Sequence, residues 1–223
     1  MLSSAGEPLP PLAPTRAASR SLVAVPPGSS PEYGRGRRSS LGAAAAAGRD
    51  RTHSEVAAGA AMVEIGNFDA FYPEGRVFGA EEVLALTRRT RELLPEVVLS
   101  VTVPHVLPLD QQEQLAVDLV AAGADLIQTE GGTSAKPFSA GSLGLIEKAA
   151  PTLAAAHSIS RAVDVPVLCA SGLSAVTLPM AIAAGAAGVG VGSAVNRLSD
   201  ELAMVAVVRG LRAAVLQAVP SRL

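Results

Sequence analysis

The chain has 223 residues, a mass of 22.5 kDa and a formal net charge of −2, enough for one domain with a tail or one barrel-sized domain. The near-neutral charge and the 3% content of aromatic residues argue against nucleic acid as the main partner. Cys169 is the only cysteine, so an intrachain disulfide and a cysteine-based zinc cluster are both excluded.

Residues 1–55 differ in composition from the rest of the chain. They hold seven of the 16 prolines and no lysine, and arginine and serine recur while acidic residues are few. No apolar periodicity typical of a strand or a helix runs through them. This composition is typical of an organelle transit peptide, and we therefore predict a disordered tail that serves as a transit segment. A biased or mis-assembled gene model is the alternative interpretation.

A repeated pattern indicates alternating strands and helices in the remainder. An Ala-Ala-Gly-Ala motif around Gly59, Gly123 and Gly185 precedes a short β-rich run each time, with spacings of 64 and 62 residues. Each spacing holds two βα units of roughly 30 residues. We therefore predict five strands, each followed by a helix, at 62–66, 97–103, 125–130, 165–170 and 187–192. Alternating βα units form a parallel sheet, either doubly wound or curved into a barrel.

The alternation of side chains along these strands favours the barrel. One parity holds apolar residues such as Val63, Ile65 and Ile127, which suit packing against helices. The other parity holds polar or minimal residues, namely Glu64, Ser100, Thr102, Gln128, Glu130, Gly190 and Gly192. Such residues suit the interior and upper rim of a barrel. The expected fold class is α/β, with parallel βα units of an aldolase-type TIM barrel over residues 56–223.

Residues 165–196 contain no charged side chain, although roughly 20 apolar residues are enough to span a bilayer. Prolines and glycines interrupt this stretch, which favours a buried strand–helix–strand segment. We therefore expect no membrane partner.

The last two units carry a pattern typical of phosphate binding. The loop after the fourth strand contains Ser171 and Gly172, and the loop after the fifth contains Gly192 and Ser193. In βα barrels the loops after the last two strands and a helix N-terminus bind phosphate, because small residues let backbone N–H groups approach the anion. Ser171, Gly172, Gly192 and Ser193 are therefore predicted to bind phosphate. Tight helix–strand packing by small residues is the alternative.

Several long motifs resemble a known family. They include VEIGNFDAFY, LSVTVPH, GADLIQTEG, GLIEKAAPTLAAAHSISRAV, PVLCASGLSAVT and MAIAAGAAGVGVGSAVN. Over residues from about 56 to the C-terminus the chain resembles the hypothetical chloroplast reading frame 23 family, aldolase-type barrel proteins of plastids and cyanobacteria. The resemblance implies a plastid location, and it makes the tail a plastid transit segment. It does not imply a reaction, and the cofactor is left unknown.

The resemblance also implies that the chain is N-terminally truncated, because the family carries three further βα units before VEIGNF. The five units present would be the last five of eight. Open sheet edges would then favour self-association, and a cooperative monomeric fold would not be expected. A truncated gene model or splice form is a further interpretation.

Candidate catalytic residues lie at or just after the predicted strand ends, where barrels carry their chemistry. Glu64, His105 and Glu130 are the predicted catalytic residues, with the two carboxylates as proton-transfer groups. For Glu64 the alternative is a polar residue in an interior hydrogen-bond network, and for His105 it is a cap of the next helix. The two carboxylates could also hold a divalent metal with Asn67 or Gln128, although the three histidines do not have metal-ligand spacing and no metal site is predicted.

The remaining chemistry-bearing residues are interpreted as structural. Lys136 falls in a loop and Lys148 in a helix, so a Schiff-base aldolase mechanism is not expected. Cys169 is expected to be a small buried residue. Three arginines are interpreted as a solvated helix face: Arg88, Arg89 and Arg91.

Two functions remain open from the sequence. One is a lyase or isomerase that acts on a small phosphorylated metabolite. The other is a non-catalytic phosphometabolite-binding or regulatory barrel. A nonfunctional truncated product is a third interpretation.

Overall fold

The structure is a computed structural model that describes residues 22–24, 60–68, 72, 75–132 and 135–218. Its sheet has six strands in the order β1-β6-β5-β4-β3-β2. The strands are β1 (Leu22–Ala24), β2 (Met62–Gly66), β3 (Val98–Thr102), β4 (Leu126–Gln128), β5 (Val167–Ala170) and β6 (Gly188–Val191). The helices are α2 (Ala80–Leu93), α3 (Leu109–Ala121), α4 (Gly141–Ala162), α5 (Leu178–Ala183), α6 (Ser193–Asn196) and α7 (Glu201–Ala218).

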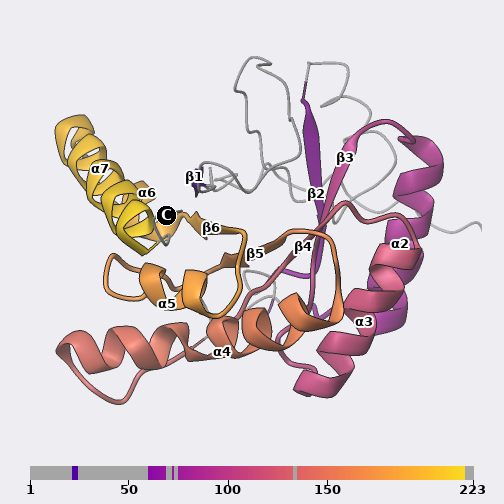
Figure 1. The fold of residues 1–223 in the computed structure, drawn as a ribbon, viewed down its shortest axis with the longest axis horizontal. Helices are drawn as coiled ribbons and strands as arrows, with labels where there is room; N and C mark the ends of the chain where they lie inside the picture. The colour runs from indigo at the N-terminus through magenta and orange to yellow at the C-terminus, as the bar shows by residue number, and fades with distance from the viewer. Residues whose placement is uncertain (1–21, 25–59, 69–71, 73–74, 133–134, 219–223) are drawn as a thin grey trace, which may run out of the picture.

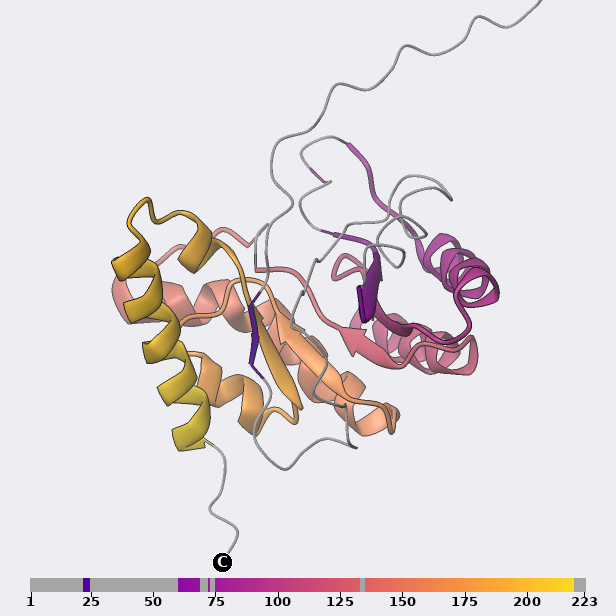
Figure 2. The same ribbon diagram turned by 90° about the horizontal axis from the view of Figure 1, so that it is seen from above.

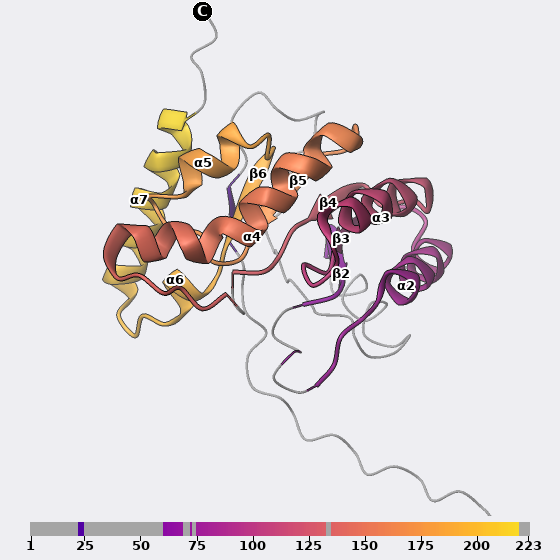
Figure 3. The same cartoon turned by 90° about the horizontal axis from the view of Figure 1, so that it is seen from below.

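Strands β2 to β6 are parallel and lie side by side in the order in which they occur in the chain. A doubly wound sheet reverses its strand order at a switch point, and this sheet has no such reversal among its parallel strands. The helices follow the strands in alternation and form an arc along one side of them (Figures 1, 2 and 3). This is the arrangement of consecutive units of a βα barrel, so the predicted fold class and all five predicted strands are confirmed.

The apolar parity of the strands forms the contact with the helices. Val63, Ile65 and Ile127 are fully buried in a core cluster shared with α2, α3 and α4. A second cluster joins Cys169 and Val189 to α5 and α7. Helix α4 contributes to both clusters, and it therefore ties the β2–β4 half of the sheet to the β5–β6 half.

Two of the three glycines in the repeated motif end helices as expected. Gly123 follows α3 with φ 100°, and Gly185 follows α5 with φ 102°. These values lie in the left-handed region that a side chain disfavours, so glycine allows the chain to leave the helix and enter the next strand. Gly59 lies outside the described residues.

The structure differs from the sequence-based expectation at one sheet edge. Within the segment predicted to be a tail, Leu22–Ala24 forms β1, which pairs antiparallel with β6. The β6 edge therefore has a hydrogen-bonded neighbour, contrary to the expectation that it would be open. The described sheet ends at β2 on its other side. The rest of residues 1–55 lies outside the described residues, so the transit segment stays a prediction.

Arg91 corrects another expectation. Its guanidinium is not solvated, because it donates to backbone carbonyls and to Asp125, with 22% of the side chain exposed. Arg89 does pair with Glu92 on the exposed face of α2. Within the described part of the chain, no helix is long and apolar enough to cross a membrane.

Candidate acid–base site at the carboxyl ends of β2, β3 and β4

The inner face of the sheet carries a polar cluster formed by Glu64, Thr102 and Gln128. Glu64 Oε1 accepts hydrogen bonds from Gln128 Nε2 at 2.5 Å and from Thr102 Oγ1 at 3.3 Å. The three residues come from neighbouring strands and face the same way, which confirms the predicted inward parity. Burial raises the pKa of the Glu64 carboxyl, and the hydrogen bonds from Gln128 and Thr102 lower it by less.

A second group of side chains, the rim cluster, lies just beyond the ends of the same three strands. It consists of Asn67 and Tyr72 after β2, His105 after β3 and Glu130 after β4. Its centre is the carboxylate of Glu130, which is only 3% exposed. Glu130 Oε1 lies 2.7 Å from Asn67 Nδ2, 2.6 Å from the Tyr72 hydroxyl and 3.1 Å from the backbone N of His105. The parallel sheet thus brings together residues that are up to 63 positions apart.

A hydrogen bond from the backbone fixes the orientation of the Asn67 amide. Its Oδ1 accepts the backbone N–H of Phe78 at 3.0 Å, which directs Nδ2 towards Glu130 and Tyr72. Asn67 is fully buried. Because the acceptor end of the amide is already used, Asn67 can offer only hydrogen-bond donors to the carboxylate.

His105 lies between Glu130, Tyr72 and the chain at Gly131. Its Nδ1 is 3.3 Å from Glu130 Oε1, and its ring centroid is 5.2 Å from that of Tyr72. A Cβ at Gly131 would lie 3.1 Å from the His105 ring and 2.8 Å from Pro151, so the glycine leaves room for the ring. Helix α3 begins at Leu109 after Pro108, and His105 is therefore not its cap.

The other oxygen of Glu130, Oε2, is buried and has no hydrogen-bond partner among the described residues. Leaving a buried acceptor unsatisfied costs about 1–3 kcal/mol, and more when the group is charged. Such an atom in a native structure calls for an explanation. The carboxylate is therefore held by one oxygen, with the other available to an additional group.

The four residues predicted to bind phosphate lie at the ends of β5 and β6. Ser171 has φ 73° and Gly172 has φ 72°, so the chain turns sharply as it leaves β5. Gly192 precedes α6, and Ser193 is its first residue. The register pairs Ala170 with Gly190, so the two loops leave neighbouring strands at the same edge of the sheet.

The loop after β5 also touches the loop that carries Glu130. A Cβ on Gly172 would lie 2.6 Å from Gly132 Cα, so the two glycines pack backbone against backbone. Gly132 is two residues from Glu130, and this contact therefore links the rim cluster to the predicted phosphate loop. It also means that one side of Gly172 is used for close packing.

Two members of the rim cluster were not predicted as catalytic residues. The sequence indicates Asn67 only as a polar residue at a strand end and a possible metal ligand, and it does not indicate Tyr72. Tyr72 lies in a loop with no periodic pattern, and its partners Glu130 and His105 are 58 and 33 residues away. Only the three-dimensional structure reveals such contacts. The two carboxylates considered as metal ligands, Glu64 and Glu130, have separate sets of partners in the structure.

A threonine pair on the helix side of β4 supports the same strand ends. Thr152 of α4 donates to the carbonyl of Ala170 at 2.6 Å and pairs with Thr129. Cys169 beside them is fully buried, as predicted, and burial raises the pKa of its thiol. These contacts fix α4 against the ends of β4 and β5.

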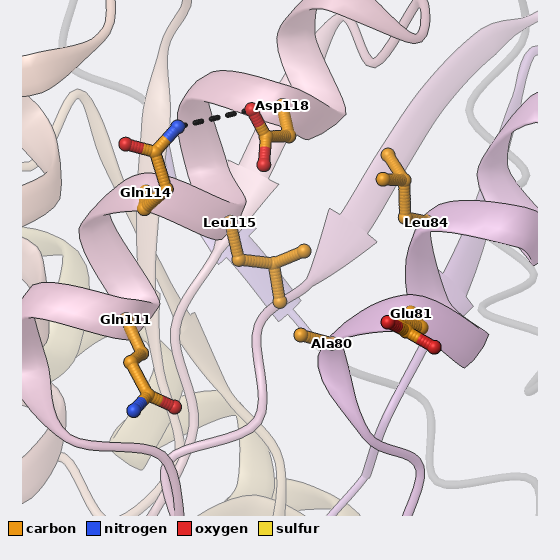
Figure 4. A pocket seen from close by; sticks show the side chains of 7 residues that line it. All are labelled: Ala80, Glu81, Leu84, Gln111, Gln114, Leu115 and Asp118. Atoms are coloured by element: carbon orange, nitrogen blue, oxygen red, sulfur yellow. Dashed lines mark hydrogen bonds between the residues drawn. The ribbon is translucent and has the colours of Figure 1, made fainter.

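A groove lies between α2 and α3, on the outer side of the sheet (Figure 4). Its lining comes from α2 and α3 alone, and one wall holds a hydrogen bond of 3.0 Å from Gln114 to Asp118. No member of the rim cluster lines this groove. The chemistry-bearing residues therefore gather at the strand ends.

Comparison with known proteins extends this description. Residues 45–220 match a family described as a protein of unknown function, DUF561. The chain belongs to this family. Relatives in it carry the name "Uncharacterized protein ycf23": the protein of Porphyra purpurea is 40% identical over 157 residues, covering 70% of this chain and 59% of the relative. That of Cyanophora paradoxa is 43% identical over 150 residues, covering 67% of this chain and 61% of the relative. The resemblance found in the sequence is thus confirmed.

This DUF561 chain spans about three-fifths of the length of the curated relatives that it matches. Membership of the family also confirms the expected plastid localisation. Among solved structures, a thiamine phosphate pyrophosphorylase from Pyrococcus furiosus is similar, with a TM-score of 0.35 and 16% identity, covering 73% of this chain and 86% of that chain.

Proposed function

We propose that this protein catalyses proton transfer on a small phosphorylated metabolite, as a lyase or an isomerase. The observation that carries the proposal is the contact between His105 and the buried carboxylate of Glu130 at the carboxyl ends of adjacent parallel strands. Active sites of βα barrels lie at this face. Histidine and glutamate are common general acids and bases, and here they lie within 3.3 Å of each other.

The arrangement of the rim cluster supports a division of roles. Three donors, from Asn67, Tyr72 and the backbone of His105, converge on Glu130 Oε1 and hold the carboxyl group in place. Glu130 is the general base. Its position beside His105 Nδ1 favours the ring tautomer protonated there, so that Nε2 carries the lone pair of the neutral ring.

Glu64 is the second proton-transfer group in this proposal. Its raised pKa keeps the carboxyl protonated to higher pH than usual, which suits a proton donor. It lies on the inner face of β2, three residues before Asn67. A ligand at the rim would then have Glu130 as base and Glu64 as acid.

Phosphate binding by Ser171, Gly172, Gly192 and Ser193 is favoured by their place at the ends of the neighbouring strands β5 and β6. The contact between Gly172 and Gly132 brings the β5 loop close to the loop that carries Glu130. Small residues at these positions let backbone N–H groups approach an anion.

A screen of phosphorylated metabolites for turnover tests the proposal. The full chain is compared with the variants Glu130→Gln and His105→Gln, each of which we expect to lower the rate by about 100- to 10,000-fold. The control is Glu92→Gln, which makes the same chemical change on the exposed face of α2. Turnover that survives Glu130→Gln would contradict the assigned base. Phosphate binding without any turnover would instead support the non-catalytic ligand-binding barrel.

The phosphate part is tested by calorimetric titration with inorganic phosphate. Gly192→Asp places a negative charge and a side chain at the predicted anion position, and we expect it to abolish binding. The control is Gly210→Asp in α7, where a Cβ would meet nothing within 4 Å. Equal binding by the wild type and the Gly192→Asp variant would show that these loops serve packing alone.

A further inference from the structure

The unpartnered oxygen of Glu130 restricts what the site can accept. Glu130 is 3% exposed, and Oε2 has no hydrogen-bond partner among the described residues. Its companion Oε1 meanwhile carries contacts from Asn67, Tyr72 and His105. The two oxygens of one carboxylate therefore have opposite environments, and the contrast points to a group that the protein itself does not supply.

The chemistry of that group follows from the hydrogen bonds that Glu130 already accepts. The Asn67 amide cannot turn to offer its oxygen, because Phe78 N–H already occupies Oδ1. Donors thus face Oε1, which is the arrangement around a carboxylate oxygen that accepts hydrogen bonds. An ionised carboxylate is an acceptor at both oxygens. The group that completes Oε2 must therefore be a hydrogen-bond donor.

We propose that one lone pair of Glu130 Oε2 accepts a hydrogen bond from a hydroxyl group of the ligand and leaves the other for the proton that the base removes, so that the site selects hydroxylated phosphate esters over their deoxy analogues. The inference rests on the proposed function, because it takes the ligand to be phosphorylated. It adds the substrate class, phosphate esters with a short hydroxylated carbon chain. It also identifies Glu130 Oε2 as the atom that recognises the hydroxyl group.

The length of the ligand follows from the loops. Gly132 packs on Gly172 and lies two positions after Glu130 in the chain. Two residues span at most about 7 Å even when fully extended. A phosphate at the Ser171–Gly172 loop and a hydroxyl at Glu130 are therefore groups of one small molecule of a few carbons, with its hydroxyl near the phosphate.

The substitution Glu130→Gln tests the role of Oε2 as a hydrogen-bond acceptor. The amide oxygen of glutamine can take over the three donors at the Oε1 position, and the amide nitrogen then stands where Oε2 was. The change converts the free acceptor into a donor with little change of shape. It tests the hydrogen-bonding character of one atom and leaves the size of the side chain almost unaltered.

The experiment is calorimetric titration of the full chain with glycerol 3-phosphate and with propyl phosphate, which has the same carbon chain without the hydroxyls. We expect the wild type to bind glycerol 3-phosphate at least about tenfold more tightly, since sites built for a hydroxyl reject analogues that lack it. The preference should fall in Glu130→Gln, whose amide nitrogen cannot accept the hydroxyl hydrogen, and should remain unchanged in the control Glu92→Gln. Equal binding of the two esters by the wild type, or an unchanged preference in Glu130→Gln, would overturn the inference.

A second measurement separates this inference from the proposed function. If neither ester binds, phosphate recognition has failed, and crystals of the full chain soaked in glycerol then test the donor position directly. A glycerol oxygen within hydrogen-bond distance of Glu130 Oε2 would show that this atom binds a hydroxyl group even though the site does not bind phosphate. An ordered water alone at that oxygen would overturn the inference, because the water would satisfy it.

Discussion

Arg91 organises the turn between α2 and β3 and the end of α3 with one guanidinium group. It donates to the carbonyls of Leu94, Pro95, Val97 and Gly123 and pairs with Asp125. Asp125 Oδ2 in turn accepts the backbone N–H of Leu99 at the start of β3. The planar fork of arginine allows several bonds in fixed directions, which the point charge of lysine does not.

We therefore expect Arg91→Lys to lower the free energy of unfolding by about 2 kcal/mol, because several charge-assisted hydrogen bonds are lost. Chemical denaturation measures the change. Arg89→Lys is the matched control, because Arg89 forms an exposed ion pair with Glu92 and the substitution should change stability by less than about 0.5 kcal/mol. Equal effects of the two substitutions would show that the Arg91 network contributes nothing.

Glu64 makes stability depend on pH. Burial raises its pKa above the ordinary value of 4.5, so the folded state binds this proton more tightly than the unfolded state. Its contribution is fully present below the unfolded pKa and is lost as the pH rises through the folded pKa. Glu64→Gln removes the titration. The difference in melting temperature, Glu64→Gln minus wild type, should therefore increase from pH 4.5 to pH 8.

The control for this series is Glu92→Gln, since Glu92 is exposed on α2. Its difference from the wild type should not increase over the same range. A constant difference for Glu64→Gln across the series would show that the Glu64 carboxyl titrates alike in both states.

The loops after β4 and β5 depend on glycine for their contact. A Cβ on Gly132 would lie 2.4 Å from Gly172 Cα, a distance that real Cβ atoms essentially never show. We expect Gly132→Ala to destabilise the protein by about 1–3 kcal/mol, because one of the two loops must move. The same substitution at Gly210 in α7 meets open space and should stabilise by about 0.5–1 kcal/mol. Thermal melting of both variants measures these changes. A Gly132→Ala variant that melts at or above the wild-type temperature would contradict the role of this contact.

The strands show what could be predicted from the sequence. Alternation along each strand placed Glu64, Thr102 and Gln128 on one face, and the structure joins them by hydrogen bonds. The period of two is a local property of the chain, so it can be read without coordinates. His105 and Glu130 were found because strand ends in barrels lie at one rim.

The contacts that could not be predicted share a physical cause. Tyr72 reaches Glu130 from a loop, and Arg91 reaches Gly123 and Asp125 across a helix end. Each depends on the relative placement of elements distant in sequence, which leaves no spacing or periodicity to detect. Strand β1 was missed for the same reason, because its pairing with β6 comes from a segment without strand-like alternation.

For the whole molecule, the sequence predicts that residues 1–50 direct plastid import and are then removed. Their arginine- and serine-rich, acid-poor composition is the basis. A fluorescent protein fused behind these residues should enter plastids, and one without them should stay in the cytosol. A fusion that remains cytosolic with the segment attached would contradict the transit role.

Proton transfer at Glu130 can be tested most directly by incubating the full chain with phosphorylated metabolites in D₂O and following their C–H signals by NMR. A base that removes a proton from carbon exchanges it with solvent even when no net reaction is seen. We predict selective loss of a C–H signal from a hydroxylated phosphate ester with the wild type, and at least about 100-fold slower exchange with Glu130→Gln. Exchange at the same rate in both proteins, or no exchange and no turnover with any ester, would contradict the proposed function.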